Sequence, residues 1–79
     1  MLGGRVNVAA GLNVRAEPNA AATVVSTLRL NQPVTLIARS QDALWLQLIL
    51  DADAGATRTG WVAAPFIDLD GTILDLPIR

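Results

Sequence analysis

The segment GWVAAPFI at positions 60–67 decides the predicted fold of this chain. Its beginning belongs to a predicted strand over residues 58–62, which returns as the hairpin partner of an earlier strand over residues 45–50. Pro65 then breaks the strand, because proline has no backbone N–H to donate to a neighbouring strand. The segment therefore predicts a β-hairpin that is followed by a break and a further apolar pair.

The rest of the chain also shows the two-residue period of β-strands. Residues 5–9 and 12–15 alternate apolar and polar side chains, which indicates half-buried strands, and residues 34–39 are rich in β-branched side chains. Predicted turns fall at residues 17–19, 31–33, 40–42 and 51–57. Turns at intervals of about 8–12 residues are typical of a small β-sandwich or barrel, and no segment predicts a long helix.

The composition limits both the size of the domain and its chemistry. A chain of 79 residues allows one small domain, and 52% apolar with 16% charged residues indicates a packed core. The net charge is −1 without a basic cluster, which argues against nucleic acid as a partner, and no apolar run is long enough for membrane insertion. The chain has no Cys and no His, which excludes disulfides, thiol nucleophiles, the commonest general base and most zinc sites.

Five short motifs follow one another in a characteristic order and spacing. They are Leu12-Asn13-Val14-Arg15 with Pro18, Val25 and Leu28 before Val34, Trp45-Leu46-Gln47-Leu48, Gly60-Trp61-Val62, and Phe66-Ile67. In these motifs the chain resembles bacterial SH3-like (SH3b) domains. The resemblance implies an all-β fold, a small SH3-like β-barrel of five to seven short strands over residues 4–69. Residues 70–79 are then an apolar C-terminal extension packed on the barrel, and we expect Ile73, Leu74 and Leu76 to be buried there.

Two positions depart from the family pattern. Glu17 stands before Pro18 where these domains usually have glycine. Asn31 replaces the usual glycine in the turn before the strand over residues 34–39, and asparagine tolerates the positive φ that such a turn requires.

A second resemblance has to be weighed against the first. The segment FIDLDGTILD, at positions 66–75, resembles the nucleophile motif of haloacid dehalogenase-like phosphatases, in which Asp68 would attack phosphorus and Asp70 would handle the leaving-group proton. The chain has no Lys to stabilise charge, and residues 76–79 leave no room for the crossover helix of a parallel sheet. We therefore interpret residues 68–71 as a turn, and a phosphatase fragment stays a remote alternative.

The main resemblance implies a non-catalytic recognition module of a larger exported bacterial protein. Such modules bind cell-wall (peptidoglycan) peptides or protein partners, which places them outside the cytoplasm or in the cell envelope. Residues 1–4 have neither a basic start nor an apolar run, so no signal peptide is predicted in them. The alternative is a structural or spacer domain that docks on a neighbouring domain. We expect a monomer without enzyme activity, cofactor or membrane insertion.

The candidate groove follows from where the family places its binding segments. Three segments surround it: the loop that follows residues 12–15, the start of the predicted strand over residues 45–50, and residues 63–66. The flat rings of Trp45 and Phe66 would contact a ligand, and Arg15 could fork onto a carboxylate. The candidate residues are Asn13, Arg15, Glu17, Trp45, Ala63, Pro65 and Phe66, with Pro65 as a rigid floor and the small Ala63 leaving room for a peptide backbone.

Several of these side chains also have purely structural interpretations. Trp45 could instead cover the core from the rim of the barrel. Arg15 could pair with Glu17 or lie over a tryptophan face. If Val62 fills the core, Trp61 is expected on the surface or against the C-terminal extension.

No metal site is expected from the acidic residues. Asp51, Asp53 and Gly55 faintly resemble a calcium loop, but the twelfth position, which needs an acidic ligand, is Val62. Asp68, Asp70 and Asp75 are interpreted as solvated turn residues.

Overall fold

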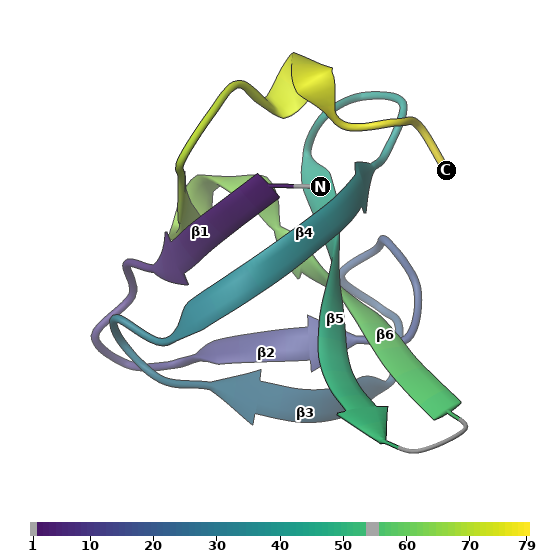
Figure 1. Cartoon of the computed structure of the whole chain (residues 1–79). Coiled ribbons are helices and arrows are strands. Elements are labelled where there is room, and N and C mark those ends of the chain that lie inside the picture. Colours follow the sequence, from purple (N-terminus) through teal and green to yellow (C-terminus); the bar gives the residue numbers. More distant parts are fainter. Residues whose placement is uncertain (1, 54–55) are drawn as a thin grey trace.

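Seven antiparallel strands form one sheet in the computed structural model, which describes residues 2–53 and 56–79 (Figure 1). The strands are β1 (Leu2–Val6), β2 (Leu12–Arg15), β3 (Val24–Leu28), β4 (Pro33–Arg39), β5 (Trp45–Asp53), β6 (Ala56–Ala63) and β7 (Ile67–Leu69). Their order across the sheet is β3-β2-β6-β5-β4-β1-β7. Two 3-10 turns, η1 (Ala64–Phe66) and η2 (Ile73–Asp75), lie on either side of β7. The predicted all-β, SH3-like barrel of five to seven strands is confirmed.

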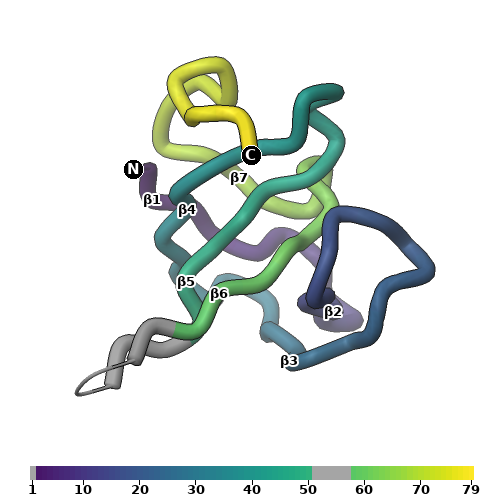
Figure 2. The backbone as a smooth tube through the Cα atoms, turned by 90° about the vertical axis from the view of Figure 1, so that its right-hand side faces the viewer, coloured from purple at the N-terminus to yellow at the C-terminus, as the bar shows by residue number. Residues whose placement is uncertain are grey.

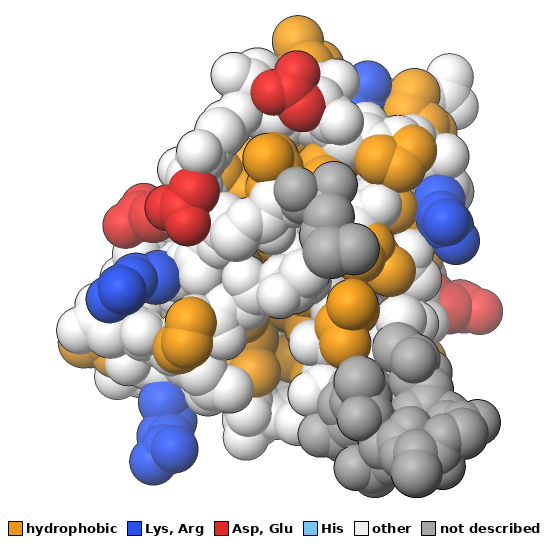
Figure 3. Space-filling model, viewed as in Figure 1, with side chains coloured by type: hydrophobic (Ala, Val, Ile, Leu, Met, Phe, Trp, Pro, Cys, Tyr) orange, Lys and Arg blue, Asp and Glu red, His pale blue; other side chains and the backbone are white. Residues whose placement is uncertain are grey.

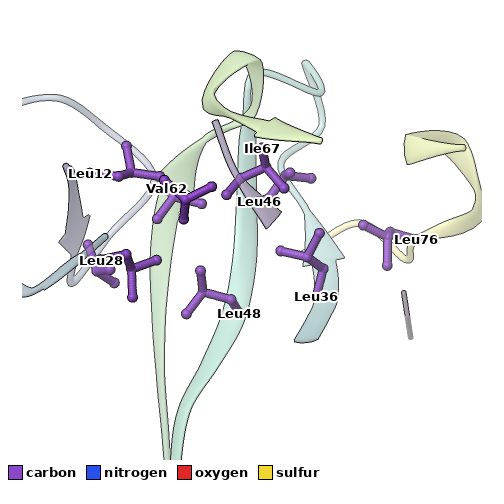
Figure 4. Close-up of a cluster of buried hydrophobic side chains, with 10 residues drawn as sticks. Leu12, Leu28, Leu36, Leu46, Leu48, Val62, Ile67 and Leu76 are labelled. Carbon is purple, nitrogen blue, oxygen red and sulfur yellow. The ribbon is translucent and has the colours of Figure 1, made fainter. Parts of the chain in front are cut away.

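One hydrophobic core explains why the sheet is curled. Leu12 and Leu28 come from β2 and β3 at one end of the strand order, and Ile67 comes from β7 at the other end, yet all three belong to one cluster (Figure 4). The largest fully buried side chains are Leu36, Leu46, Leu48, Val6, Val14 and Val62. Because alternate side chains of each strand point inward, the two-residue period of the sequence becomes the inner face of the barrel.

The first strand lies earlier in the chain than the sequence predicts. β1 is Leu2–Val6 rather than residues 5–9, and it begins before residue 4, the predicted start of the barrel. The chain turns at residues 8–11, where the Gly11 backbone N–H donates to the Val8 carbonyl over 3.2 Å and Gly11 has a φ of 92°. This turn ends the strand, and it places residues 8–11 beside the groove described below.

The hairpin of β5 and β6 is longer than predicted. β5 continues to Asp53 and β6 begins at Ala56, so both strands extend into the predicted loop over residues 51–57. Gly55 and the side chains of Asp51 and Asp53, which faintly resemble a calcium loop, lie outside the described part of the chain.

The turn before β4 has the backbone that the sequence predicts. Asn31 has a φ of 66°, which confirms that asparagine occupies a left-handed position here. Its backbone N–H donates to the Val6 carbonyl over 2.8 Å, and this bond fixes the turn against the end of β1.

The C-terminal segment contacts the barrel through only some of its apolar residues. Leu76 is 3% exposed and joins the core cluster (Figure 4). Ile73 is partly buried and packs against this cluster. Leu74 is 68% exposed, so its predicted burial is wrong. The reason is the three-residue period of η2, which puts residues 73 and 76 on one side of the turn and residue 74 on another.

The last residues of the chain lie beside β4. The Arg39 backbone N–H donates to the Pro77 carbonyl over 2.8 Å, and the Arg79 N–H donates to the Arg39 carbonyl over 3.0 Å. Arg39 and Ile78 form a parallel bridge.

The segment FIDLDGTILD contains a strand as well as a turn. Ile67–Leu69 is β7, and Asp68 is opposite Arg5 in an antiparallel pairing with β1. The predicted turn over residues 68–71 is therefore shorter, because the bend begins only after Leu69. An antiparallel strand at this position differs from the parallel strand that the phosphatase fold requires.

Candidate peptide-binding groove

A groove of about 350 Å³ lies between the β1–β2 connection, the β2–β3 loop and the start of β5. It is lined by Val8, Gly11, Leu12, Asn13, Arg15, Ala20, Trp45, Ala63 and Phe66. Figure 2 shows the β2–β3 loop as an arch that stands out beside β6. Segments far apart in the sequence thus line the groove, and they include the rings of Trp45 and Phe66 as well as Ala20 of the β2–β3 loop.

Trp45 is positioned by the register of the central hairpin. It begins β5 and lies directly opposite Ala63 of β6, so the indole has a small neighbour at its base. Its side chain is half-buried and does not belong to the core cluster. Trp45 is therefore a groove-lining residue and does not cover the core.

The turn before Trp45 is held by a network of hydrogen bonds. Ser40 is buried, and its hydroxyl donates to Asp42 Oδ1 over 2.5 Å and accepts from the Trp45 backbone N–H over 3.1 Å. Asp42 Oδ1 also accepts from the Leu44 N–H over 3.0 Å. The hydrogen bond from Ser40, followed by that from Leu44, lowers the pKa of Asp42 below its ordinary value of 3.8.

This network predicts a pH dependence of stability. A carboxylate with a lowered pKa in the folded state stabilises the fold above its unfolded pKa of about 3.8 and loses this effect as the pH falls through the folded pKa. Asp42→Asn should therefore lower the melting temperature at neutral pH, and the difference from the native sequence should shrink at about pH 2, below the unfolded pKa. Thermal melts at both pH values measure it. Asp75→Asn is the control, and an equal loss from Asp42→Asn at both pH values would contradict the assignment.

Phe66 is presented by η1, which is held from two sides. The Ala64 N–H donates to the Leu44 carbonyl over 2.8 Å. Asn7 donates from its backbone N–H to the Phe66 carbonyl over 3.0 Å and from Nδ2 to the Pro65 carbonyl over 3.3 Å. Phe66 is 43% exposed, so its ring offers an apolar face at the groove. The hydrogen bonds to η1 hold the backbone that carries this ring.

Arg15 fastens the β2–β3 loop. Its Nη1 donates to the Ala22 carbonyl over 2.8 Å, while the Ala16 N–H donates to the Thr23 carbonyl over 2.9 Å. The guanidinium thus contacts loop backbone rather than Glu17, whose pairing with Arg15 was one of the two structural alternatives. Since Ala20 lies on this loop, Arg15 also holds one wall of the groove in place.

A family model of the bacterial SH3 domain matches residues 10–68. The chain belongs to the bacterial SH3 domain family. No curated protein and no solved structure matches this SH3 domain. The match spans all strands from β2 to β6 and the groove segments of β5, β6 and η1. It identifies a family of binding domains that are typically non-catalytic.

Most of the predicted site residues lie together in the groove of this SH3 domain. Asn13, Arg15, Trp45, Ala63 and Phe66 line it. Glu17 and Pro65 do not: Glu17 is exposed on the loop, and Pro65 is exposed in η1.

Four lining residues were missed by sequence reasoning: Val8, Gly11, Leu12 and Ala20. Residue 8 falls in the strand predicted over residues 5–9, and residue 11 lies between the two predicted strands, whereas both belong to one turn. Gly11 was the available signal of that turn. Leu12 was expected in the half-buried strand over residues 12–15, and it belongs both to the core cluster and to the groove lining.

Trp61 is not on the surface of this SH3 domain, so that prediction is wrong. It is 7% exposed, although Val62, its neighbour in the chain, fills the core. Trp61 lies opposite Arg15 of β2 and Gln47 of β5. Trp61 is thus flanked by a strand on each side, and residues directly opposite one another have neighbouring side chains, so alternation along β6 alone does not give its exposure.

Among the side chains that the structure describes, those of residues 2–50 and 58–79, no group of three or more Asp or Glu residues is placed to hold a metal ion. Asp68 is engaged by Asn7, whose Nδ2 donates to Asp68 Oδ1 over 3.0 Å. In the same described ranges no helix has the length and apolar character needed to cross a membrane.

Proposed function

We propose that this SH3 domain is a non-catalytic recognition module of a larger exported bacterial protein and acts as a monomer at the cell envelope. Its groove binds an extended peptide segment, from the cell wall or from a protein partner. The observation that carries this proposal is the groove itself: Trp45 and Phe66 present rings over a small apolar floor, and Arg15 supplies a charge at the wall.

The physical chemistry of the groove favours peptide over other ligands. Aromatic side chains beside backbone-sized space are the elements by which small β-domains recognise extended segments. Both rings are held by hydrogen-bonded turns, so little conformational freedom is lost when a ligand binds. With only these rings in contact, we expect weak binding, micromolar to millimolar, which corresponds to about −8 to −4 kcal/mol.

Removal of the Trp45 ring tests the proposal. Soluble peptidoglycan stem peptides, titrated into ¹⁵N-labelled domain, should bind the native sequence, and Trp45→Ala should weaken that binding at least about tenfold because the ring face is lost. The fold should remain, since Trp45 is outside the core cluster. Leu74→Ala, which removes an exposed apolar side chain outside the groove, is the matched control.

Two results would contradict the proposal. One is unchanged binding by Trp45→Ala, which would place the site elsewhere. The other is unfolding of Trp45→Ala, which would make Trp45 a structural residue and leave the groove without its main contact.

A second function, a spacer domain docked on a neighbour, is favoured by the C-terminal segment. Leu74 and Ile78 are 68% and 54% exposed. Figure 3 shows apolar side chains at the top of the molecule, where Figure 1 places this segment. If docking is the function, stem peptides should cause no localised shifts, and Leu74→Asp should release the domain from its neighbour in the parent protein.

A further inference from the structure

The described residues that line the groove carry positive charge only. Arg15 is the single charged residue among its lining residues, all of which belong to the described part of the chain. The other lining side chains with polar groups are Asn13 and Trp45, which has one indole N–H. No carboxylate lines the groove to neutralise the guanidinium. A ligand that lies in this groove therefore meets an unpaired cation in an otherwise apolar setting, where a charge interaction is stronger than in bulk water.

The guanidinium of Arg15 is oriented by one hydrogen bond and has further N–H groups that can donate to a ligand. Nη1 donates to the Ala22 carbonyl over 2.8 Å, which is the only hydrogen bond that the side chain makes to the described residues. This bond occupies the Nη1 side of the guanidinium and leaves the edge formed by Nε and Nη2 for another acceptor. Two N–H groups on one edge match the two oxygens of a carboxylate.

The size of the groove limits what can accompany that carboxylate. Its volume of about 350 Å³ is near the lower end of the roughly 300–1,000 Å³ that ligand sites occupy. Gly11, Ala20 and Ala63 are the smallest lining residues, so a peptide backbone can approach the walls.

We propose that the groove selects a peptide of small residues that carries a carboxylate, which binds the Nε–Nη2 edge of Arg15 while the backbone lies between Trp45 and Phe66. This inference rests on the proposed function and makes it more specific, because it distinguishes acidic peptides from neutral and basic ones. The carboxylate comes either from a free C-terminus or from an acidic side chain. Arg15 is then the specificity-determining residue.

Three short peptides of matched size test this selection. They are N-acetylated trialanine with a free carboxylate, the same peptide with a carboxamide terminus, and an N-acetylated Ala-Glu-Ala carboxamide. We expect the native domain to bind trialanine carboxylate about tenfold more tightly than its carboxamide, equivalent to about 1.4 kcal/mol. The third peptide shows whether a side-chain carboxylate can replace the terminal one. The preference should shrink between about 0.1 M and 1 M salt, as the Debye length falls from about 10 Å to 3 Å.

Arg15→Gln separates recognition from loop support. If Arg15 binds the carboxylate, this variant should lose the preference and bind both trialanine peptides equally, even if the lost hydrogen bond to Ala22 lowers both affinities together. If Arg15 only fastens the β2–β3 loop, both peptides should lose affinity together and the preference should persist, which would overturn the inference. Equal binding of the three peptides by the native domain would overturn it too. Binding of none of them would contradict the peptide-binding function itself.

Discussion

Replacement of Leu48 by alanine is expected to lower the free energy of unfolding by about 2–5 kcal/mol. Leu48 is completely buried in the core cluster and lies opposite Leu36 on β4 and Gly60 on β6. The truncation leaves a cavity between three strands that are fixed by their hydrogen-bond ladders and cannot collapse to fill it. A domain of 79 residues has a total free energy of unfolding of about 4–12 kcal/mol, so the variant loses a large part of its stability.

Leu74→Ala is the matched control for Leu48→Ala, because it removes the same atoms from a side chain that is 68% exposed. Urea unfolding of both variants measures the two changes. The control should lie within about 0.5 kcal/mol of the native domain. Equal effects of the two substitutions would contradict the description of the core.

Gly60→Ala is expected to destabilise the domain by about 1–3 kcal/mol through overpacking. A Cβ at position 60 would overlap Cγ1 of Val14, a fully buried side chain of β2, and would also meet the Arg15 carbonyl oxygen at 3.4 Å. Gly60 has no left-handed backbone, unlike Gly11, so the cost comes from contact alone. The glycine of the Gly60-Trp61-Val62 motif is thus required by the close crossing of β2 over β6.

A double substitution isolates this contact. Val14→Ala removes Cγ1, so Gly60→Ala should cost clearly less in the Val14→Ala background than in the native sequence. Chemical denaturation of the four proteins gives the coupling energy. Strictly additive effects would show that the overlap with Val14 is not the cause.

The elements that the sequence predicts well are those with a local signal. The strand over residues 12–15 agrees with β2, and the turn chemistry of Asn31 correctly indicated a positive φ. The position of β1 was missed, because Gly3 and Gly4 give no strand propensity and their pairing with Thr35 and Val34 of β4 is a long-range contact. Strand pairing of this kind leaves no trace in the local pattern.

The candidate-site residues that could be predicted from the sequence are those with a distinctive side chain in a recognisable motif. Trp45 and Phe66 were found because they stand in motifs that resemble those of bacterial SH3 domains, at positions where the family has its groove. Ala20 has no such signal, and it enters the groove only because Arg15 fastens the loop on which it lies. Trp61 has a distinctive side chain, but its burial was predicted wrongly, because its exposure depends on the neighbouring strands rather than on β6 alone.

Chemical-shift mapping of the ¹⁵N-labelled native domain with N-acetylated trialanine carboxylate tests the peptide-binding groove most directly. We predict saturable shifts at the backbone amides of Gly11 and Ala20 and at the indole N–H of Trp45, with Leu74 unaffected. Shifts confined to the C-terminal segment, or none at millimolar peptide, would contradict the account.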